Sequence, residues 1–113
     1  MKTIFCDIDG TILEHVGKLS NINSEQKILN GTLEKFEEWH RKNYLIILTT
    51  ARPDSMFEFT KTQLQNLGIV YDKLITGLNN GERIVINDIN SEGICRALAL
   101  NLKRNEGLSN ISI

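Results

Sequence analysis

The sequence predicts an α/β fold built on a parallel sheet, and three observations support this class. Short apolar runs of strand-forming residues alternate with segments of helical periodicity. The run from Tyr44 to Thr50 is apolar almost throughout, which is typical of a parallel strand covered on both faces. Three of the apolar runs also end in polar residues, as expected where the carboxyl ends of parallel strands form a ligand site.

Length and composition indicate one ordinary globular domain. A chain of 113 residues forms one domain, 1–113, with room for a core. The net charge of −1, with scattered Lys and Arg, predicts no nucleic-acid partner. No apolar run is long enough to cross a membrane and the N-terminus reads directly into a strand, so we expect a cytoplasmic protein. Cys6 and Cys95 lie in predicted strands with apolar neighbours, which favours buried, reduced thiols.

The first strand, within Thr3 to Thr11, ends in two acids. Side chains alternate along a strand, so Asp7 and Asp9 start on one face, and Gly10 allows the backbone to turn so that the carboxylates converge. Two close carboxylates repel each other unless a cation or a shared proton relieves them. Because these ligands are oxygens, the expected cation is Mg²⁺.

The segment before the second strand predicts a flap and one helix. The alternation around Gly17 is consistent with a small hairpin in which His15 is an exposed residue. The polar stretch 21–30 indicates a loop or a single helical turn. Beyond Gly31, apolar residues recur at helical spacing, and Trp39 is expected to pack this helix onto the sheet.

The second strand is followed closely by a helix. Pro53 suits the first turn of a helix, and the pattern from Pro53 to Leu67 is helical. A strand, a short loop and a helix in quick succession direct free backbone N–H groups and a hydroxyl off the sheet edge, which suits a phosphate. Three more strands are predicted, at 69–76, 83–88 and 97–102. The polar tail at 103–113 is expected at the surface or in a subunit contact.

Three motifs resemble those of the haloacid dehalogenase (HAD) superfamily, most of whose members are Mg²⁺-dependent phosphatases. Asp-Ile-Asp-Gly-Thr, which begins at Asp7, is similar to motif I. The strand ending at Thr50, in the context Thr-Ala-Arg-Pro, is similar to motif II, and Asn-Asp-Ile-Asn around Asp88 is similar to motif IV. Each follows an apolar run, in the order of the family.

The resemblance implies roles for individual residues. Asp7 would be the nucleophile that becomes an aspartyl phosphate, and Asp9 the general acid and base. Mg²⁺ would be held by Asp7, the backbone carbonyl of Asp9, and Asp88. Phosphate or substrate contacts are implied at Gly10, Thr11, Thr50, Ala51, Arg52 and Lys73.

The resemblance also implies a fold and a substrate class. The expected architecture is a three-layer α/β/α Rossmann-like sandwich with a parallel sheet of order 3-2-1-4-5. No insertion follows Thr50, so a cap domain is not expected. An open site suits a large substrate or needs a neighbouring subunit, which leaves a homo-oligomer open. Small capless relatives include phosphatases of sugar phosphates in surface-polysaccharide biosynthesis, which favours a small-molecule phosphate ester.

The cation of motif III is missing from its usual place. The loop from Gly77 to Gly81 contains no Lys or Arg. Arg52 is the preferred substitute because it lies two residues beyond Thr50. At a rise of roughly 3.3 Å per residue, Arg83 would lie about 16 Å behind Asp88 in a strand, at the wrong end of the sheet. The other candidates are Lys73, Lys61, Lys103 and Arg104.

Other classes fit less well. The missing cation is consistent with a catalytically weak or silent HAD-like domain that binds or regulates, and this is the main alternative. A receiver-like module places its acid pair and its acceptor Asp on different strands, whereas Asp7 and Asp9 follow the same strand. A metal-dependent sugar transferase needs a longer chain for its nucleotide-sugar domain.

Overall fold

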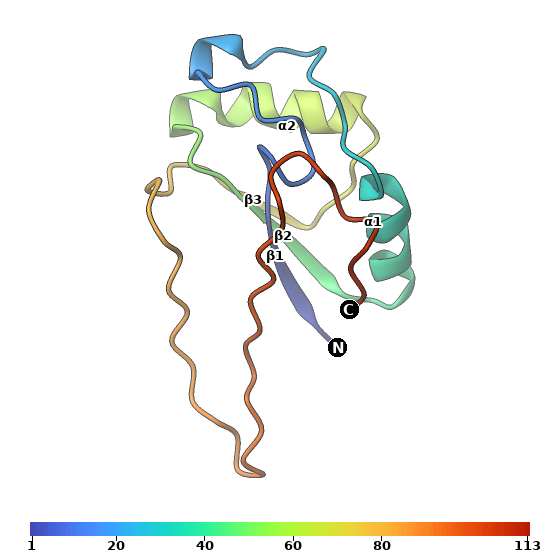
Figure 1. The fold of residues 1–113 in the computed structure, drawn as a ribbon, viewed down its shortest axis with the longest axis vertical. Coiled ribbons are helices and arrows are strands. Elements are labelled where there is room, and N and C mark those ends of the chain that lie inside the picture. The colour runs from blue at the N-terminus through green and yellow to red at the C-terminus, as the bar shows by residue number, and fades with distance from the viewer.

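A computed structural model describes all residues from Met1 to Ile113 and confirms an α/β fold with a parallel sheet (Figure 1). The sheet has three strands in the order β1-β2-β3. The strands are β1 (Thr3–Asp7), β2 (Leu45–Thr49) and β3 (Lys73–Ile75), and the helices are α1 (Thr32–Arg41) and α2 (Phe57–Asn66), with short 3-10 turns at Leu19–Asn21 (η1) and Asp54–Met56 (η2).

Both helices pack against one face of the sheet. Ile46 and Leu48 of β2 are completely buried and belong to the same cluster as Trp39 of α1 and Leu64 of α2. Trp39 therefore packs its helix onto the sheet, as the sequence predicts. The helices cover the face that carries Ile46 and Leu48, whereas Ile47, which points to the opposite face, is 8% exposed and Leu45 is 38% exposed.

The opposite face of the sheet carries no helix, and although Ile47 at its centre is buried, apolar side chains around it are exposed. Paired residues of neighbouring strands point to the same face, and the register pairs Thr3 with Leu45 and Thr49 with Ile75. Every second residue of each strand therefore lies on this face. Phe5, Leu45 and Ile75, which we call the open face, are 66%, 38% and 42% exposed. The structure thus has two layers where the sequence predicts three, because the segment after β3 adds no helix.

The predicted strands at 83–88 and 97–102 do not form. Residues 79–102 instead make a long, extended excursion, the arm, whose two limbs reach well beyond the rest of the molecule (Figure 1). Its backbone hydrogen bonds are confined to a turn at the tip, between Asn90, Gly93 and Ile94. A strand requires a hydrogen-bonded partner, and neither limb has one, so strands four and five of the expected order are absent. Cys95 lies on the arm and is exposed, contrary to prediction, whereas Cys6 is buried as expected.

The predicted hairpin around Gly17 is replaced by irregular chain. Isolated bridges join Asp9 to Leu13 and Leu13 to Ile28. The stretch 22–30 is a loop, one of the two predicted alternatives, and a short helical turn, η1, precedes it. No helix has both the length and the apolar character needed to span a membrane.

The C-terminal tail is part of the body, contrary to prediction. Leu108 is 1% exposed and joins the core, and its N–H donates to the Asn30 carbonyl at 2.7 Å. Gly107 has φ +81°, and a Cβ there would collide with the Asn30 backbone. The tail therefore returns the chain from the arm to the sheet, which determines what lies near β1.

Shortening Leu108 tests this packing. Leu108→Ala should lower the free energy of unfolding by roughly 2–5 kcal/mol, because it leaves a cavity in the core. Urea denaturation measures the change. Leu19→Ala is the control, since Leu19 is 54% exposed and the same truncation at the surface should cost under about 0.5 kcal/mol. Equal, small effects would contradict a buried tail.

Candidate active site

The end of β1 forms a tight turn that presents Asp7. Gly10 has φ +90°, a conformation that favours glycine. The N–H groups of Thr11, Ile12 and Leu13 all point at the Ile8 carbonyl oxygen, at 3.1, 3.0 and 3.1 Å. The Thr11 hydroxyl donates to the Asp7 carboxylate at 3.2 Å. The turn thus holds Asp7 at the carboxyl edge of the sheet, beside Thr49 of β2.

The Asp7 carboxylate is only partly compensated. Loss of hydration raises the pKa of Asp7 above its usual range, although the side chain reaches the surface. The hydrogen bond from Thr11, the Ile8 amide and the Arg83 guanidinium lower this pKa, and the Asp9 charge raises it. A further cation at this edge would favour the ionised, nucleophilic form.

Asp9, in contrast, is fully engaged in an ion pair. Arg52 Nε donates to Asp9 Oδ2 at 2.9 Å and Arg52 Nη2 donates to Asp9 Oδ1 at 2.8 Å, which is a bidentate arrangement. The Arg52 side chain is 1% exposed and that of Asp9 is 20% exposed. Both oxygens of the second acid are therefore occupied by protein donors.

Arg52 is not available for a phosphate, which corrects the sequence prediction. Its Nη1 donates to Thr60 at 3.0 Å and to Gln63 at 2.8 Å, and its Nη2 also donates to Gln26 at 3.2 Å. Distance along the chain placed Arg52 near the edge, but α2 presents a polar, buried face that draws the guanidinium inward. Arg52 is a positioning residue for Asp9.

Two buried glutamines complete this arrangement, and the sequence analysis did not identify either. Gln26 Nε2 donates to Asp9 Oδ1 at 2.9 Å, and Gln63 Nε2 donates to the Gln26 side-chain oxygen at 3.0 Å. The available signal was the α2 sequence itself, because Thr60, Gln63 and Leu64 share one helical side and only Leu64 is apolar. Polar residues on the core side of a helix indicate a buried partner.

Thr50 and Ala51 lie where a phosphoryl group is expected. Thr50 follows β2, is 2% exposed, and its hydroxyl oxygen accepts the Arg52 N–H at 3.0 Å. The hydroxyl proton has no acceptor within the chain, and the Ala51 N–H donates no hydrogen bond. Neither group donates a hydrogen bond within the chain, so the predicted phosphate contacts at Thr50 and Ala51 stay predictions.

The structure does not bring Asp88 or Lys73 to this site. Asp88 lies on the arm, exposed, and pairs with Arg96. Asp7, Asp9 and Asp88 therefore do not form a carboxylate cluster, and no group of three metal-ligating side chains occurs. The motif IV prediction fails because its strand has no partner in the sheet. Lys73 is exposed at the first position of β3, opposite Ile47, away from the carboxyl edge.

Two other arginines replace Arg52 as candidate cations. Arg104 packs against Gly10, and a Cβ on Gly10 would lie 3.1 Å from Arg104 Cγ and 3.7 Å from its Nε. The next residue, Asn105, donates its N–H to the Gly10 carbonyl at 2.8 Å and accepts the His15 N–H at 2.7 Å. The positive charge of Arg83 lowers the pKa of Asp7. Because 83–88 is not a strand, the strand-length distance used to rank Arg83 does not apply.

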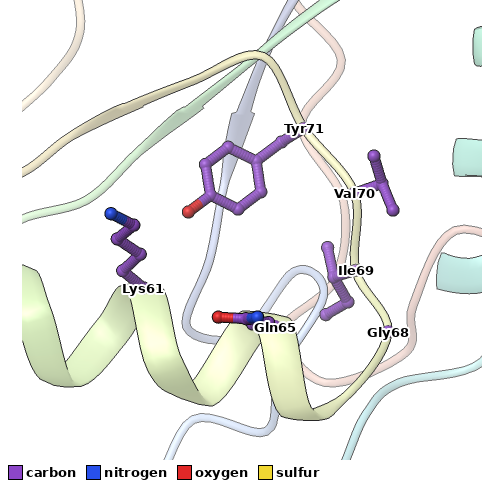
Figure 2. A pocket seen from close by; sticks show the side chains of 6 residues that line it. All are labelled: Lys61, Gln65, Gly68, Ile69, Val70 and Tyr71. Atoms are coloured by element: carbon purple, nitrogen blue, oxygen red, sulfur yellow. The ribbon is translucent and has the colours of Figure 1, made fainter.

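Two hollows of the surface lie away from Asp7. One of about 280 Å³ lies where the end of α2 meets the chain entering β3, and Lys61 and Tyr71 extend along its wall (Figure 2). Burial, with the nearby Glu58 carboxylate, raises the pKa of Tyr71. This hollow contains no carboxylate, so the chemistry belongs to the edge that carries Asp7.

Comparison with known proteins identifies the family of the chain. The family model of haloacid dehalogenase-like hydrolases matches residues 4–109. None of the curated proteins matches the chain. Among solved structures, a structural-genomics target from Vibrio cholerae is similar with a TM-score of 0.58 and 19% identity, over 80% of this chain and 82% of that one. That likeness concerns the fold.

A parallel sheet with an acid pair at its carboxyl edge, and a family match over most of the chain, define a hydrolase of the HAD class. The chain belongs to the haloacid dehalogenase-like hydrolase family.

Replacing Arg52 tests the buried pair. Arg52→Met should lower the free energy of unfolding by roughly 3–5 kcal/mol, because Asp9 and the two glutamines lose their partner in a buried site. Arg96→Met is the control: it breaks an Arg–Asp pair whose side chains are 53% and 72% exposed, and should cost less than about 1 kcal/mol. Chemical denaturation compares the two variants, and a similar, small loss in both would refute the structural role of Arg52.

Proposed function

We propose that this protein is a Mg²⁺-dependent phosphatase that hydrolyses a small-molecule phosphate monoester through an aspartyl phosphate on Asp7. The observation that carries the proposal is the contrast between the two acids of motif I. Asp7 is held by Thr11 at the open edge of the sheet, whereas Asp9 is fixed by Arg52. In a HAD-like hydrolase, that contrast matches a nucleophile beside a separate acid and base.

The donors near Asp7 fit a magnesium ion of low protein coordination. The Asp9 carbonyl accepts no hydrogen bond within the chain, so it is free beside the Asp7 carboxylate. Mg²⁺ is commonly held by one or two carboxylates together with water and substrate phosphate. We assign it to Asp7 and the Asp9 carbonyl, without Asp88. When bound, it would supply positive charge that offsets the phosphate and favours ionised Asp7.

The chain's own groups then account for both steps. An oxygen of Asp7 attacks phosphorus, the bond to the leaving oxygen breaks, and Asp9 donates a proton to that oxygen. Asp9 then takes a proton from water as the water attacks phosphorus, which releases inorganic phosphate and restores Asp7. The Thr50 hydroxyl and the Ala51 N–H orient the phosphoryl oxygens.

Asp9 can perform this role only after it rearranges. Both of its oxygens accept hydrogen bonds from Arg52 in the present structure. A carboxyl group must leave the Nε contact before it can carry a proton to the substrate. We infer that Arg52 holds Asp9 in a resting position and that substrate binding shifts it.

Arg104 and Arg83 supply the cation that motif III lacks. The Arg104 side chain forms no ion pair and lies against Gly10, and Arg83 donates only to backbone carbonyls at the base of the arm. Free guanidinium groups beside a phosphoryl site stabilise its charge. The substrate class that we favour, a sugar phosphate, comes from resemblance to small capless phosphatases.

A second candidate is a HAD-like domain that binds a phosphate ester without turnover. The Asp9–Arg52 pair favours it, because an acid locked by two hydrogen bonds cannot donate a proton. Turnover in the presence of Mg²⁺ distinguishes an enzyme from a binding domain.

Asp7→Asn tests the nucleophile. In an assay of phosphate release with Mg²⁺, from a general phosphate ester and a panel of sugar phosphates, the variant should lose activity by at least roughly a thousandfold. Asp88→Asn is the matched control, since it removes the same charge from the arm and should retain activity. An Asp7→Asn variant as active as the parent would rule out the mechanism.

Arg104→Ala tests the replacement cation. The variant should raise KM and lower kcat/KM by roughly tenfold to a hundredfold, because a charge-assisted contact to the phosphate is lost. Lys103→Ala removes a cation from the neighbouring position and should change neither constant appreciably. Steady-state kinetics with one phosphate ester decides the matter. Equal changes in KM and kcat/KM in the two variants would contradict a specific contact from Arg104 and indicate an effect of net charge alone.

A further inference from the structure

We propose that the arm, residues 79–102, is an assembly element that covers the open face of a second copy of this chain. The proposal goes beyond the chemistry of Asp7 and rests on the surface of the molecule. It commits to one partner, another copy, and to one contact, arm against sheet.

The arm exposes an unusual amount of apolar surface. Three consecutive residues, Ile84, Val85 and Ile86, are 74%, 67% and 89% exposed. So much exposed apolar surface on one short segment is unusual for a monomer and indicates an interaction site. Other large apolar side chains exposed on the arm are Ile89, Ile94, Leu98, Leu100 and Leu102.

The backbone of the arm is also unpartnered. Outside the tip turn, no N–H or C=O group of either limb pairs with another backbone group. Extended segments in this state pair readily with another strand, such as the arm of a second copy. They are excluded from the hydrocarbon of a membrane, where unpaired backbone groups have no water.

The charges of the arm argue against a nucleic acid. Asp88 and Arg96 pair with each other, and Arg83 donates to backbone carbonyls at the base of the arm. With three acidic side chains and two arginines, the arm has no excess of positive charge to bind a phosphate backbone. The arm therefore suits an apolar protein surface.

This chain itself offers such a surface. No helix lies on the open face, and Phe5 remains 66% exposed with the chain's own arm in place, although Ile47 beside it is buried. Both ends of that arm are tied at the carboxyl edge, where the Leu78 N–H donates to Thr50 and the Asn105 N–H to Gly10. Two copies related by a two-fold axis would each cover the other's sheet.

The size of the arm suits a stable dimer. Each partner in such an interface contributes roughly 20–30 residues, about the length of this segment. The arm would thus provide the layer that the sheet lacks on its open face.

Sedimentation velocity of the full chain over a wide concentration range tests the proposal. The parent should be a dimer, and Ile86→Asp should weaken it by roughly tenfold or more, because a charge is buried at the contact. Phe5→Asp should weaken it comparably from the other side of the contact. Val70→Asp is the control, since Val70 is 63% exposed on the turn before β3 and lies outside the contact.

Each outcome is decisive. A parent that stays monomeric overturns the proposal. A dimer also overturns it if the Ile86→Asp or Phe5→Asp variant dissociates no more readily than the Val70→Asp control. If circular dichroism shows that Ile86→Asp is unfolded, Leu98→Asp on the other limb, where the residue is 82% exposed, replaces it with the same expectation. Hydrogen exchange should show the arm and β1 protected in the dimer and released in the variants.

Discussion

The buried ion pair between Asp9 and Arg52 ties the ends of two neighbouring strands to α2 and to the irregular segment before α1. Arg52 follows β2, Asp9 follows β1, and Gln63 belongs to α2. Gln63 also donates to the Asn23 carbonyl at 2.7 Å, so the irregular segment before α1 is held as well. Burying an arginine is costly unless its donors are satisfied. Here the guanidinium has five side-chain hydrogen bonds, and this requirement fixes the relative positions of the segments.

The same pair divides the chemistry of the two acids. With Asp9 compensated by Arg52, Asp7 keeps a carboxylate that desolvation and the Asp9 charge destabilise. A cation that approaches Asp7 offsets this destabilisation of the carboxylate, so the site favours a metal ion or an arginine there. Arg104 reaches this edge only because Leu108 anchors the returning tail in the core. The position of Arg104 at the site therefore depends on the packing of Leu108 in the core, through the C-terminal tail.

Sequence reasoning succeeded where local pattern determines structure. The strand that ends at Asp7, the helix that carries Trp39 and the β2 run were predictable because apolar periodicity and burial agree there. It failed where the outcome depends on a distant partner. Residues 83–88 have strand-forming composition without a hydrogen-bonded neighbour, and Arg52 is drawn inward by the polar side of α2. A one-dimensional distance cannot detect either effect.

The missing layer and the exposed arm have one explanation. A parallel sheet is normally covered on both faces, and this sheet has helices on one. The segment after β3 would ordinarily supply the other layer, but residues 79–102 extend beyond the body instead. The apolar residues expected in that layer are present, at Ile84 and Ile86 among others, but they are exposed. The chain has the apolar residues of a covering layer but does not fold them onto its own sheet. They need another surface to bury them, and the sheet of a second copy has a face without helices that can provide it.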